Sequence, residues 1–192
     1  RRELPSATIY VYDNASTDHT REKAREAGAE VRREIHRGKG NVVHSMFRDI
    51  EADIYILVDG DDTHEAHDVH ELLKPVENGD VDITVGNRLK SATTASITFT
   101  HIVGNKILRW ILNTLFHSDF QDILSGFRVM NRRFVKTSPI LARGFEVETE
   151  MTIHALERGY LMREIPIEYR ARPAGSHSKI REFQDGFRIL ST

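Results

Sequence analysis

The chain has 192 residues, 39% of them hydrophobic, and its 27 lysines and arginines against 29 aspartates and glutamates give a formal net charge of -2. This length supports one sizeable core and a single domain, and the charge balance disfavours a nucleic-acid binder that relies on bulk positive charge. Because the chain has no cysteine, disulfides and thiolate metal sites are excluded. No apolar run approaches the ~18 to 20 residues of a membrane span.

Strand-like apolar runs alternate with helical patterns along the first half of the chain. Strands are predicted at residues 7–12, 29–33, 53–59 and 81–86, and helices at residues 17–27, 39–50 and 65–76. This order predicts an α/β fold with a Rossmann-like, mostly parallel sheet and helices on both faces. Ligands of such sheets bind beyond the carboxyl ends of the strands, and Asp13, Asp59 and Arg88 all follow predicted strand ends. We therefore expect a functional site on that rim.

The second half of the chain begins with a long apolar segment at residues 96–120. It is either a core helix or a helix lying partly in a membrane interface, which Trp110 beside Arg109 and Lys106 favours. After it, a strand is predicted at residues 126–131, a helix at residues 146–157 and a strand at residues 161–170.

Two further groups of side chains could bind a ligand. The sequence RARPAGSHSK at residues 170–179 is either a solvated loop or a flexible basic cradle for phosphate that includes Arg172, Ser176 and Lys179. The sequence HEAHDVH at residues 64–70 sets three histidines three positions apart, which suggests zinc. That spacing is not the one of a zinc-binding helix, however, and the neighbouring acids are typical of a solvated face.

The stretch YILVDGDDTH places Asp59, Asp61 and Asp62 directly after a buried strand. Such acids can form an ordinary turn in which Asp62 or Thr63 caps the next helix. They also fit the Asp-x-Asp-x-Thr pattern of haloacid-dehalogenase-like phosphatases, but the acids of the following GDVD lie too close in sequence for the remaining parts of such an enzyme. Alternatively, Asp59 and Asp61, on either side of Gly60, could hold a divalent cation against the diphosphate of a nucleotide sugar.

Seven short motifs favour the last of these interpretations. In chain order they are DNASTDHT (13–20), RGKGN (37–41), DGD (59–61), GNR (86–88), DILSGFR (122–128), GFEVETE (144–150) and RPAGSHSK (172–179). Together they resemble the inverting family 2 glycosyltransferases, most closely the branch of dolichyl-phosphate mannose synthase and bacterial polyprenyl-phosphate sugar transferases. The resemblance implies a glycosyltransferase A fold. It also implies one catalytic domain over residues 1–192 that lacks the family's first strand and helix, and both chain ends read as cut from a longer protein.

The resemblance further implies a role for individual residues. Donor contacts would come from Asp13, Lys39, Asp59 and Gly60, Mg²⁺ or Mn²⁺ would be held by Asp59 and Asp61, and Asp61 and Asp122 would be the catalytic residues. The acceptor phosphate would be bound by Arg88, Arg128, Arg172, Ser176 and Lys179. Related mannose synthases often carry Gln two positions after the second metal aspartate, where this chain has Thr63. The third metal ligand is thus open between Thr63, Asp62 and water.

The implied reaction is the inverting transfer of a sugar from a nucleotide sugar to a polyprenyl (dolichyl or undecaprenyl type) phosphate, at the cytoplasmic face of a membrane. A phosphate acceptor is largely anionic near pH 7 and needs no strong general base, so Asp122 would orient the acceptor or the donor sugar. One alternative is a transferase of the same fold that acts on a hydroxyl group, with Asp122 or Glu148 as the base. Another is a non-catalytic nucleotide-sugar-binding module, which the intact Asp59 and Asp61 disfavour.

Overall fold

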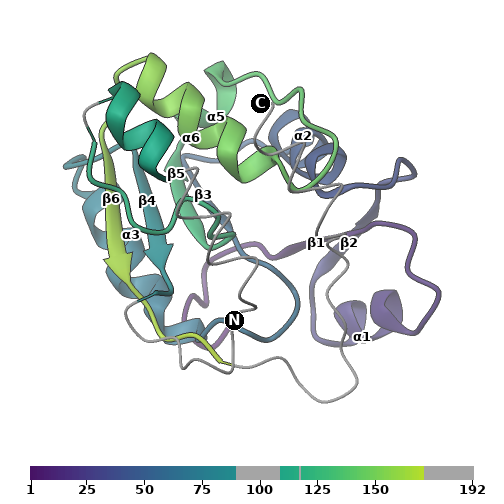
Figure 1. The fold of residues 1–192 in the computed structure, drawn as a ribbon. Helices are drawn as coiled ribbons and strands as arrows, with labels where there is room; N and C mark the ends of the chain where they lie inside the picture. The colour runs from purple at the N-terminus through teal and green to yellow at the C-terminus, as the bar shows by residue number, and fades with distance from the viewer. Residues whose placement is uncertain (90–108, 117, 171–192) are drawn as a thin grey trace.

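The computed structural model describes residues 1–89, 109–116 and 118–170 (Figure 1). Its strands are β1 (Tyr10–Asp13), β2 (Glu30–Arg33), β3 (Ile54–Leu57), β4 (Ile83–Asn87), β5 (Arg128–Asn131) and β6 (Met162–Pro166). Its helices are α1 (Thr20–Glu26), α2 (Lys39–Asp49), η1 (Ala66–Asp68), α3 (Val69–Glu77), α5 (Arg132–Thr137) and α6 (Val147–Glu157). Residues 109–116 are also helical.

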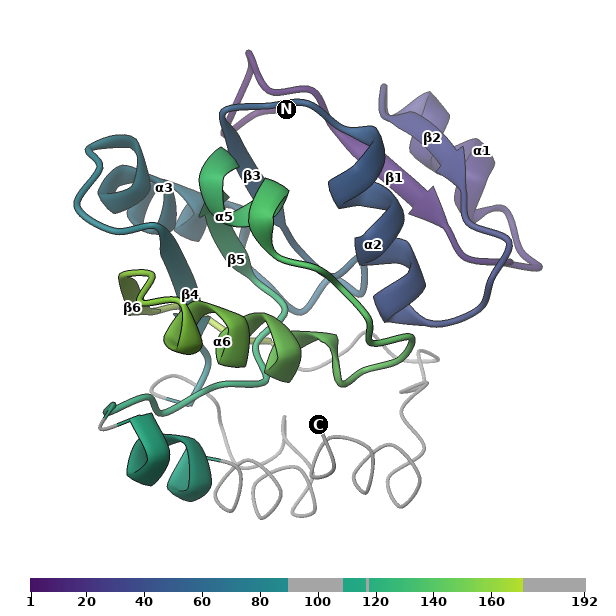
Figure 2. The same ribbon diagram turned by 90° about the horizontal axis from the view of Figure 1, so that it is seen from above.

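The described strands form two sheets. β1 pairs with β2 in parallel, and a four-stranded sheet has the order β3-β5-β4-β6. In both Figure 1 and Figure 2, β1 and β2 lie on the β3 side of the larger sheet, away from β6. The pairing of β4 with β6 is parallel, as expected, but β5 runs antiparallel to both β3 and β4. A pattern of apolar residues does not encode strand direction, so the antiparallel β5 was not predictable from it.

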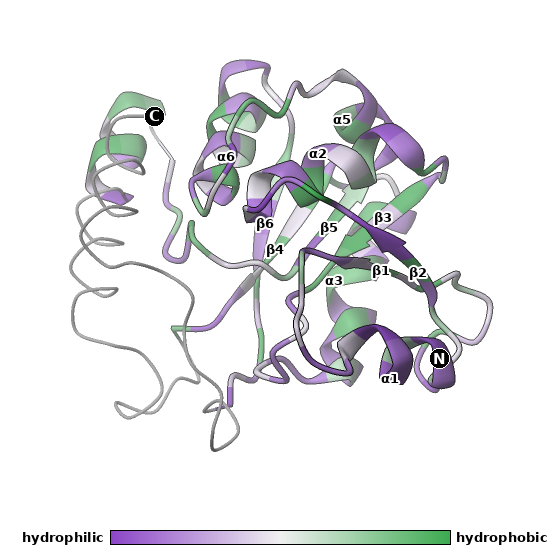
Figure 3. Cartoon of the chain, turned by 90° about the vertical axis from the view of Figure 1, so that its right-hand side faces the viewer, coloured by the Kyte–Doolittle hydropathy of each residue, from purple (hydrophilic) through white to green (hydrophobic). Residues whose placement is uncertain are grey.

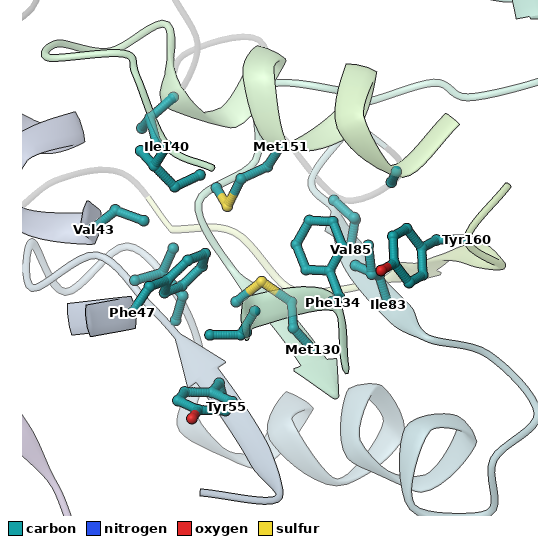
Figure 4. Packing of buried hydrophobic residues seen from close by; sticks show 14 residues of the cluster. Val43, Phe47, Tyr55, Ile83, Val85, Met130, Phe134, Ile140, Met151 and Tyr160 are labelled. Carbon is teal, nitrogen blue, oxygen red and sulfur yellow. The ribbon is translucent and has the colours of Figure 1, made fainter. Parts of the chain in front are cut away.

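Helices cover both faces of the larger sheet, which confirms the layered α/β arrangement. On one face α2, α5 and α6 pack over a cluster that includes Phe47, Met130 and Phe134 (Figure 4). On the other face α3 packs through Leu72 against Val129 and neighbouring side chains. Adjacent residues of β5 thus point into opposite clusters, because successive side chains of a strand alternate between its faces.

Helix boundaries differ locally from the predicted ones. The helix expected from residue 65 begins as the short turn η1 and becomes α-helical only at Val69. The sequence analysis missed α5, whose N-cap Asn131 accepts a hydrogen bond from the Phe134 amide at 2.9 Å. Asparagine is a strong N-cap residue, so this was an available signal. α1, by contrast, was predicted, although it buries no residue and is largely hydrophilic along its length (Figure 3).

The apolar segment expected at residues 96–120 is described only from residue 109 onward. Its helical part is anchored by Leu112, which is buried in a cluster with Ile123, while Trp110 is 69% exposed. Its described part buries Leu112 and exposes Trp110 and Leu115, so it is not wholly a core helix, and its position in a membrane interface stays a prediction. Within the described ranges, no helix is long and apolar enough to cross a membrane.

Candidate functional site

Lys39 connects two acids from distant parts of the chain. It is the first residue of α2, and its Nζ lies 2.6 Å from Oδ1 of Asp59, just after β3. The same Nζ forms an ion pair with Oε1 of Glu148, in the first turn of α6. The side chains of Lys39 and Glu148 are largely buried, whereas that of Asp59 is 35% exposed. One ammonium group therefore holds two carboxylates together at the edge of the sheet.

The electrostatics of the Lys39–Asp59 ion pair favour the charged form of both groups. Burial by itself would lower the pKa of Lys39, but the carboxylates of Glu148 and Asp59 outweigh burial and raise it. Burial would likewise raise the pKa of Asp59, but the neighbouring Lys39 ammonium outweighs burial and lowers it. Lys39 and Asp59 therefore stay ionised around neutral pH.

Glycines in two of the motifs are explained by close approach to this cluster. A Cβ on Gly126 would lie 2.9 Å from Nζ of Lys39 and closer still to Oδ2 of Asp59. A Cβ on Gly40 would lie 2.5 Å from the carbonyl carbon of Ala142 and closer still to its oxygen. Backbone cannot yield, so position 40 requires glycine, whereas a Cβ at position 126 would displace the ends of the Asp59 and Lys39 side chains. In the RGKGN motif, glycine thus serves protein packing, a reason that sequence alone did not reveal.

The three glutamates of GFEVETE have separate roles. Glu150 accepts hydrogen bonds from the amides of Leu141 and Ala142, at 2.8 and 3.0 Å. Glu146 accepts from the amides of Arg143 and Gly144, at 3.1 and 3.0 Å. These two acids fix the loop that passes over the start of α2. Glu148 instead forms an ion pair with Lys39.

Asp122, predicted as a catalytic residue, is fully buried and paired with Arg88. Its Oδ2 accepts from Nε of Arg88 and its Oδ1 from NH2, both at 2.8 Å, and Oδ2 also accepts from the Arg88 amide at 3.0 Å. Burial would lower the pKa of Arg88, but Asp122 outweighs burial and raises it. Oε1 of Glu164, on β6, accepts a hydrogen bond from the Asp122 amide at 2.6 Å and so holds the loop that carries Asp122 in place. The structure thus makes Asp122 the residue that orients Arg88 and not a group open to substrate.

Arg128 lies elsewhere than the sequence analysis expected. Its side chain is 0% exposed, and its guanidinium donates to the backbone oxygens of Ile123 and Ser125 and to Oγ1 of Thr152. Burial lowers its pKa to about 10, although the nearby carboxylate of Glu148 counteracts part of the effect. An acceptor phosphate does not reach so enclosed a group, so the predicted phosphate contact is corrected. Arg128 supports the loop that carries Asp122.

The DGDDT turn shows how Asp61 is oriented. The Thr63 hydroxyl donates to Oδ1 of Asp61 at 2.7 Å, and Thr63 is almost completely buried. Thr63 is therefore the support of Asp61 and not itself positioned as a third metal ligand. No atom of the described residues lies within 4 Å of a Cβ built on Gly60, so among these residues nothing covers that side of the turn.

The residues present are compatible with a hard divalent cation. In the described part of the chain, no three His, Cys, Asp or Glu side chains converge in a metal-binding group. Mg²⁺, however, is commonly held by one or two carboxylates together with substrate phosphates and water. Asp59 and Asp61 on one tight turn match this donor set, provided that a phosphate ligand completes it.

The segment after β6, which leads to the basic sequence at residues 170–179, is bound to the DGDDT turn. The Arg170 amide donates a hydrogen bond to the backbone oxygen of Thr63 at 2.9 Å, and the Arg170 side chain forms an ion pair with Glu65. The ring of Tyr169 lies 5.4 Å from the Arg88 guanidinium. Arg172, Ser176 and Lys179 lie outside the described residues, so their predicted phosphate contacts stay predictions.

The three histidines of HEAHDVH do not form a zinc site. His64 is packed between the rings of Phe127 and Tyr169, at centroid distances of 5.3 and 5.5 Å. Burial lowers the pKa of His64, and the nearby positive charge of Arg88 lowers it further. His70 instead contacts Glu3 at 3.1 Å on the surface. The side chains are held by different partners, and the zinc interpretation is not supported.

Asp13 forms the other end of the rim. It is 3% exposed, and its Oδ1 accepts from the Ser16 amide at 3.1 Å. Its buried Oδ2 has no hydrogen-bond partner among the described residues and lies 3.7 Å from Nε of Arg21. Asn14, which the sequence analysis did not single out, accepts from the Gly38 amide at 2.7 Å. This bond ties the Asp13 loop to the start of α2, where Lys39 lies.

Residues 2–138 match glycosyl transferase family 2, and the chain belongs to that family. It is 35% identical over 186 residues to the glycosyltransferase AglJ of Haloferax volcanii, covering 96% of this chain and 61% of AglJ. It is 24% identical over 193 residues to the dolichol-phosphate mannosyltransferase of Pyrococcus furiosus, covering 90% of this chain and 50% of the relative.

Among solved structures, the chain resembles Mycobacterium tuberculosis glucosyl-3-phosphoglycerate synthase in complex with Mn²⁺, UDP-glucose and phosphoglyceric acid. The TM-score is 0.75 at 20% identity, covering 95% of this chain and 65% of the other. This similarity confirms the expected glycosyltransferase A fold. The chain spans about two thirds or less of the length of these relatives.

Proposed function

We propose that the protein transfers a sugar from a nucleotide-sugar donor to a polyprenyl phosphate, with inversion and with Mg²⁺ or Mn²⁺ held by Asp59 and Asp61. The observation that carries the proposal is the Lys39 cluster, in which RGKGN, DGD, DILSGFR and GFEVETE meet around one ammonium group. Family membership and the named complex with Mn²⁺ and UDP-glucose support a nucleotide sugar as donor.

The rim offers a distinct group to each part of the donor. Oδ2 of Asp13, which faces Arg21 at 3.7 Å and has no hydrogen-bond partner among the described residues, can accept a hydrogen bond from a ribose hydroxyl or the base. Lys39 can donate to the sugar or the diphosphate, and the open face of Gly60 lets a ligand approach the backbone. A divalent cation at Asp59 and Asp61 would neutralise the negative charge that develops on the leaving diphosphate.

The acceptor side favours a phosphate over a hydroxyl group. A hydroxyl acceptor needs a base, but both oxygens of Asp122 accept from Arg88, and Glu148 is paired with Lys39. A phosphate needs no base. The name of one relative, the dolichol-phosphate mannosyltransferase, mentions a lipid phosphate. The proposal further includes a long-chain lipid on the acceptor phosphate and a location of the protein at the cytoplasmic face of a membrane.

The test is a product assay. The protein is incubated with Mn²⁺, a panel of nucleotide sugars, and either undecaprenyl phosphate, dolichyl phosphate or the matching unphosphorylated alcohols, and products are detected by mass spectrometry. We expect sugar on the lipid phosphates alone. Transfer only to alcohols or soluble sugar hydroxyls would contradict the phosphate acceptor and would favour Glu148 as a base.

Arg88→Lys is expected to lower kcat/KM for the acceptor by about tenfold, since lysine keeps the charge but loses the planar, bidentate geometry. The KM for the donor should change by less than about twofold. Steady-state kinetics with each substrate varied in turn measure both values. Arg163→Lys is the matched control, because Arg163 is exposed on β6. An unchanged acceptor KM with a raised donor KM would assign Arg88 to the diphosphate.

Trp110→Glu is expected to weaken binding to liposomes that contain anionic lipid several-fold. Trp110 is 69% exposed next to Arg109, a combination suited to a membrane interface. Flotation of the protein with liposomes measures the effect. Leu161→Glu is the control, because Leu161 is similarly exposed, at 60%, on a different part of the chain. Equal flotation of wild type and Trp110→Glu would remove the support for this surface.

A further inference from the structure

Lys39 neutralises Asp59 in the way that a bound metal ion would. Its Nζ lies 2.6 Å from Oδ1 of Asp59, one of the two carboxylates that we assign to the divalent cation. It also contacts Oε1 of Glu148, so two negative charges converge on a single positive one. The chain itself thus supplies a cation at this part of the site.

This ion pair is not needed to hold the surrounding loop. The loop at residues 141–144 is already fixed by four backbone hydrogen bonds to Glu146 and Glu150. The side chains of Lys39 and Asp59 are 17% and 35% exposed, so a ligand can reach the ammonium and its more exposed partner, Asp59. The arrangement is therefore suited to an exchange of partners.

A divalent cation without nucleotide binds unfavourably at Asp59, because the Lys39 ammonium already occupies this carboxylate. It must either displace the ammonium or bind beside it, and two neighbouring cations repel each other. A nucleoside diphosphate changes this balance, since its negative charges offset the added positive charge and offer the lysine new oxygen partners. The same lysine would therefore oppose the metal alone and tolerate the metal together with the diphosphate.

We propose that Lys39 is an internal counter-ion that makes divalent-cation binding depend on the nucleoside diphosphate. Without nucleotide the ammonium stays on Asp59 and Glu148 and weakens metal binding. When metal and diphosphate enter together, the ammonium shifts from Asp59 towards the diphosphate oxygens. This inference rests on the metal site of the proposed function and extends it to the order of binding.

The test measures Mn²⁺ affinity directly, by electron paramagnetic resonance of the free ion, in the absence of any sugar or acceptor. Titrations are made with no nucleotide, with UDP and with GDP. In Lys39→Gln the dissociation constant for Mn²⁺ alone should fall at least tenfold, and the gain from adding nucleotide should shrink. Lys39→Arg retains the positive charge and should keep the weak binding of the wild type.

Glu148→Gln provides a second, independent variant. It keeps the ammonium on Asp59 and removes one negative charge, so Mn²⁺ alone should bind at least threefold more weakly than to wild type. Circular dichroism establishes which variants are folded. If folded Lys39→Gln binds Mn²⁺ alone as weakly as wild type, or if Glu148→Gln binds it more tightly, the counter-ion role is wrong.

Failure of this inference can be told apart from failure of the proposed function. If Asp61→Asn leaves Mn²⁺ binding unchanged, the metal site itself is wrong and the inference falls with it. If Asp61→Asn abolishes Mn²⁺ binding while Lys39→Gln has no effect, the metal site stands and only the counter-ion role falls. The titrations contain no acceptor, so their outcome does not depend on which acceptor the protein uses.

Discussion

Asp61→Asn is expected to reduce sugar transfer by on the order of a thousandfold, because a metal-bound carboxylate supports several kcal/mol of charge stabilisation in the transition state. The fold should be retained, since asparagine keeps the shape of the side chain and its carbonyl oxygen can still accept the Thr63 hydroxyl bond, 2.7 Å long in the wild type. Initial rates with saturating donor and Mn²⁺ measure the loss, and circular dichroism checks the fold.

Asp62→Asn is the matched control. Asp62 is the neighbouring acid, exposed and with φ at 58°, a backbone conformation that asparagine also adopts readily. Its activity should stay within about twofold of wild type if water and not Asp62 is the third metal ligand, and a larger loss would assign that role to Asp62. The metal assignment would be contradicted if Asp61→Asn transferred sugar at the wild-type rate, and above all if it did so in the presence of EDTA.

Gly40→Ala is expected to destabilise the protein by about 3 kcal/mol, because a methyl group would be forced into the backbone of Ala142. Helix propensity alone predicts the opposite, a gain of about 1 kcal/mol for alanine within α2. The steric clash is the larger effect, since the obstructing atoms belong to backbone. For a chain of this length Tm should fall by roughly 6–12 °C, which differential scanning calorimetry measures.

Gly60→Ala is the comparison for stability. A Cβ at this position meets nothing within 4 Å in the part of the chain that the structure describes, and Gly60 is not among the residues with positive φ. Its free energy of unfolding should change by no more than about 0.5 kcal/mol. If Gly40→Ala and Gly60→Ala melted at the same temperature, the loop at residues 141–144 would not lie as close to α2 as the structure has it.

Local patterns were sufficient for most elements. Apolar runs of strand length predicted the six strands, and helical patterns predicted α1, α2, α3 and α6, since side-chain periodicity follows directly from backbone geometry. The direction of β5 was beyond this reasoning, because an apolar run reads the same whichever way its strand pairs. The helix α5 is too short to establish a period, and only its N-cap Asn131 marked it.

The sequence by itself determined the family, the fold class and the rim that carries Asp13, Asp59 and Arg88, because order along the chain decides which residues follow strand ends. Only the tertiary structure decided what each charged group faces. It buried Arg128 under a loop, paired Asp122 with Arg88, and placed Lys39 between Asp59 and Glu148. The state of a partly buried charge depends on the few groups within hydrogen-bonding distance, and these come from distant parts of the sequence.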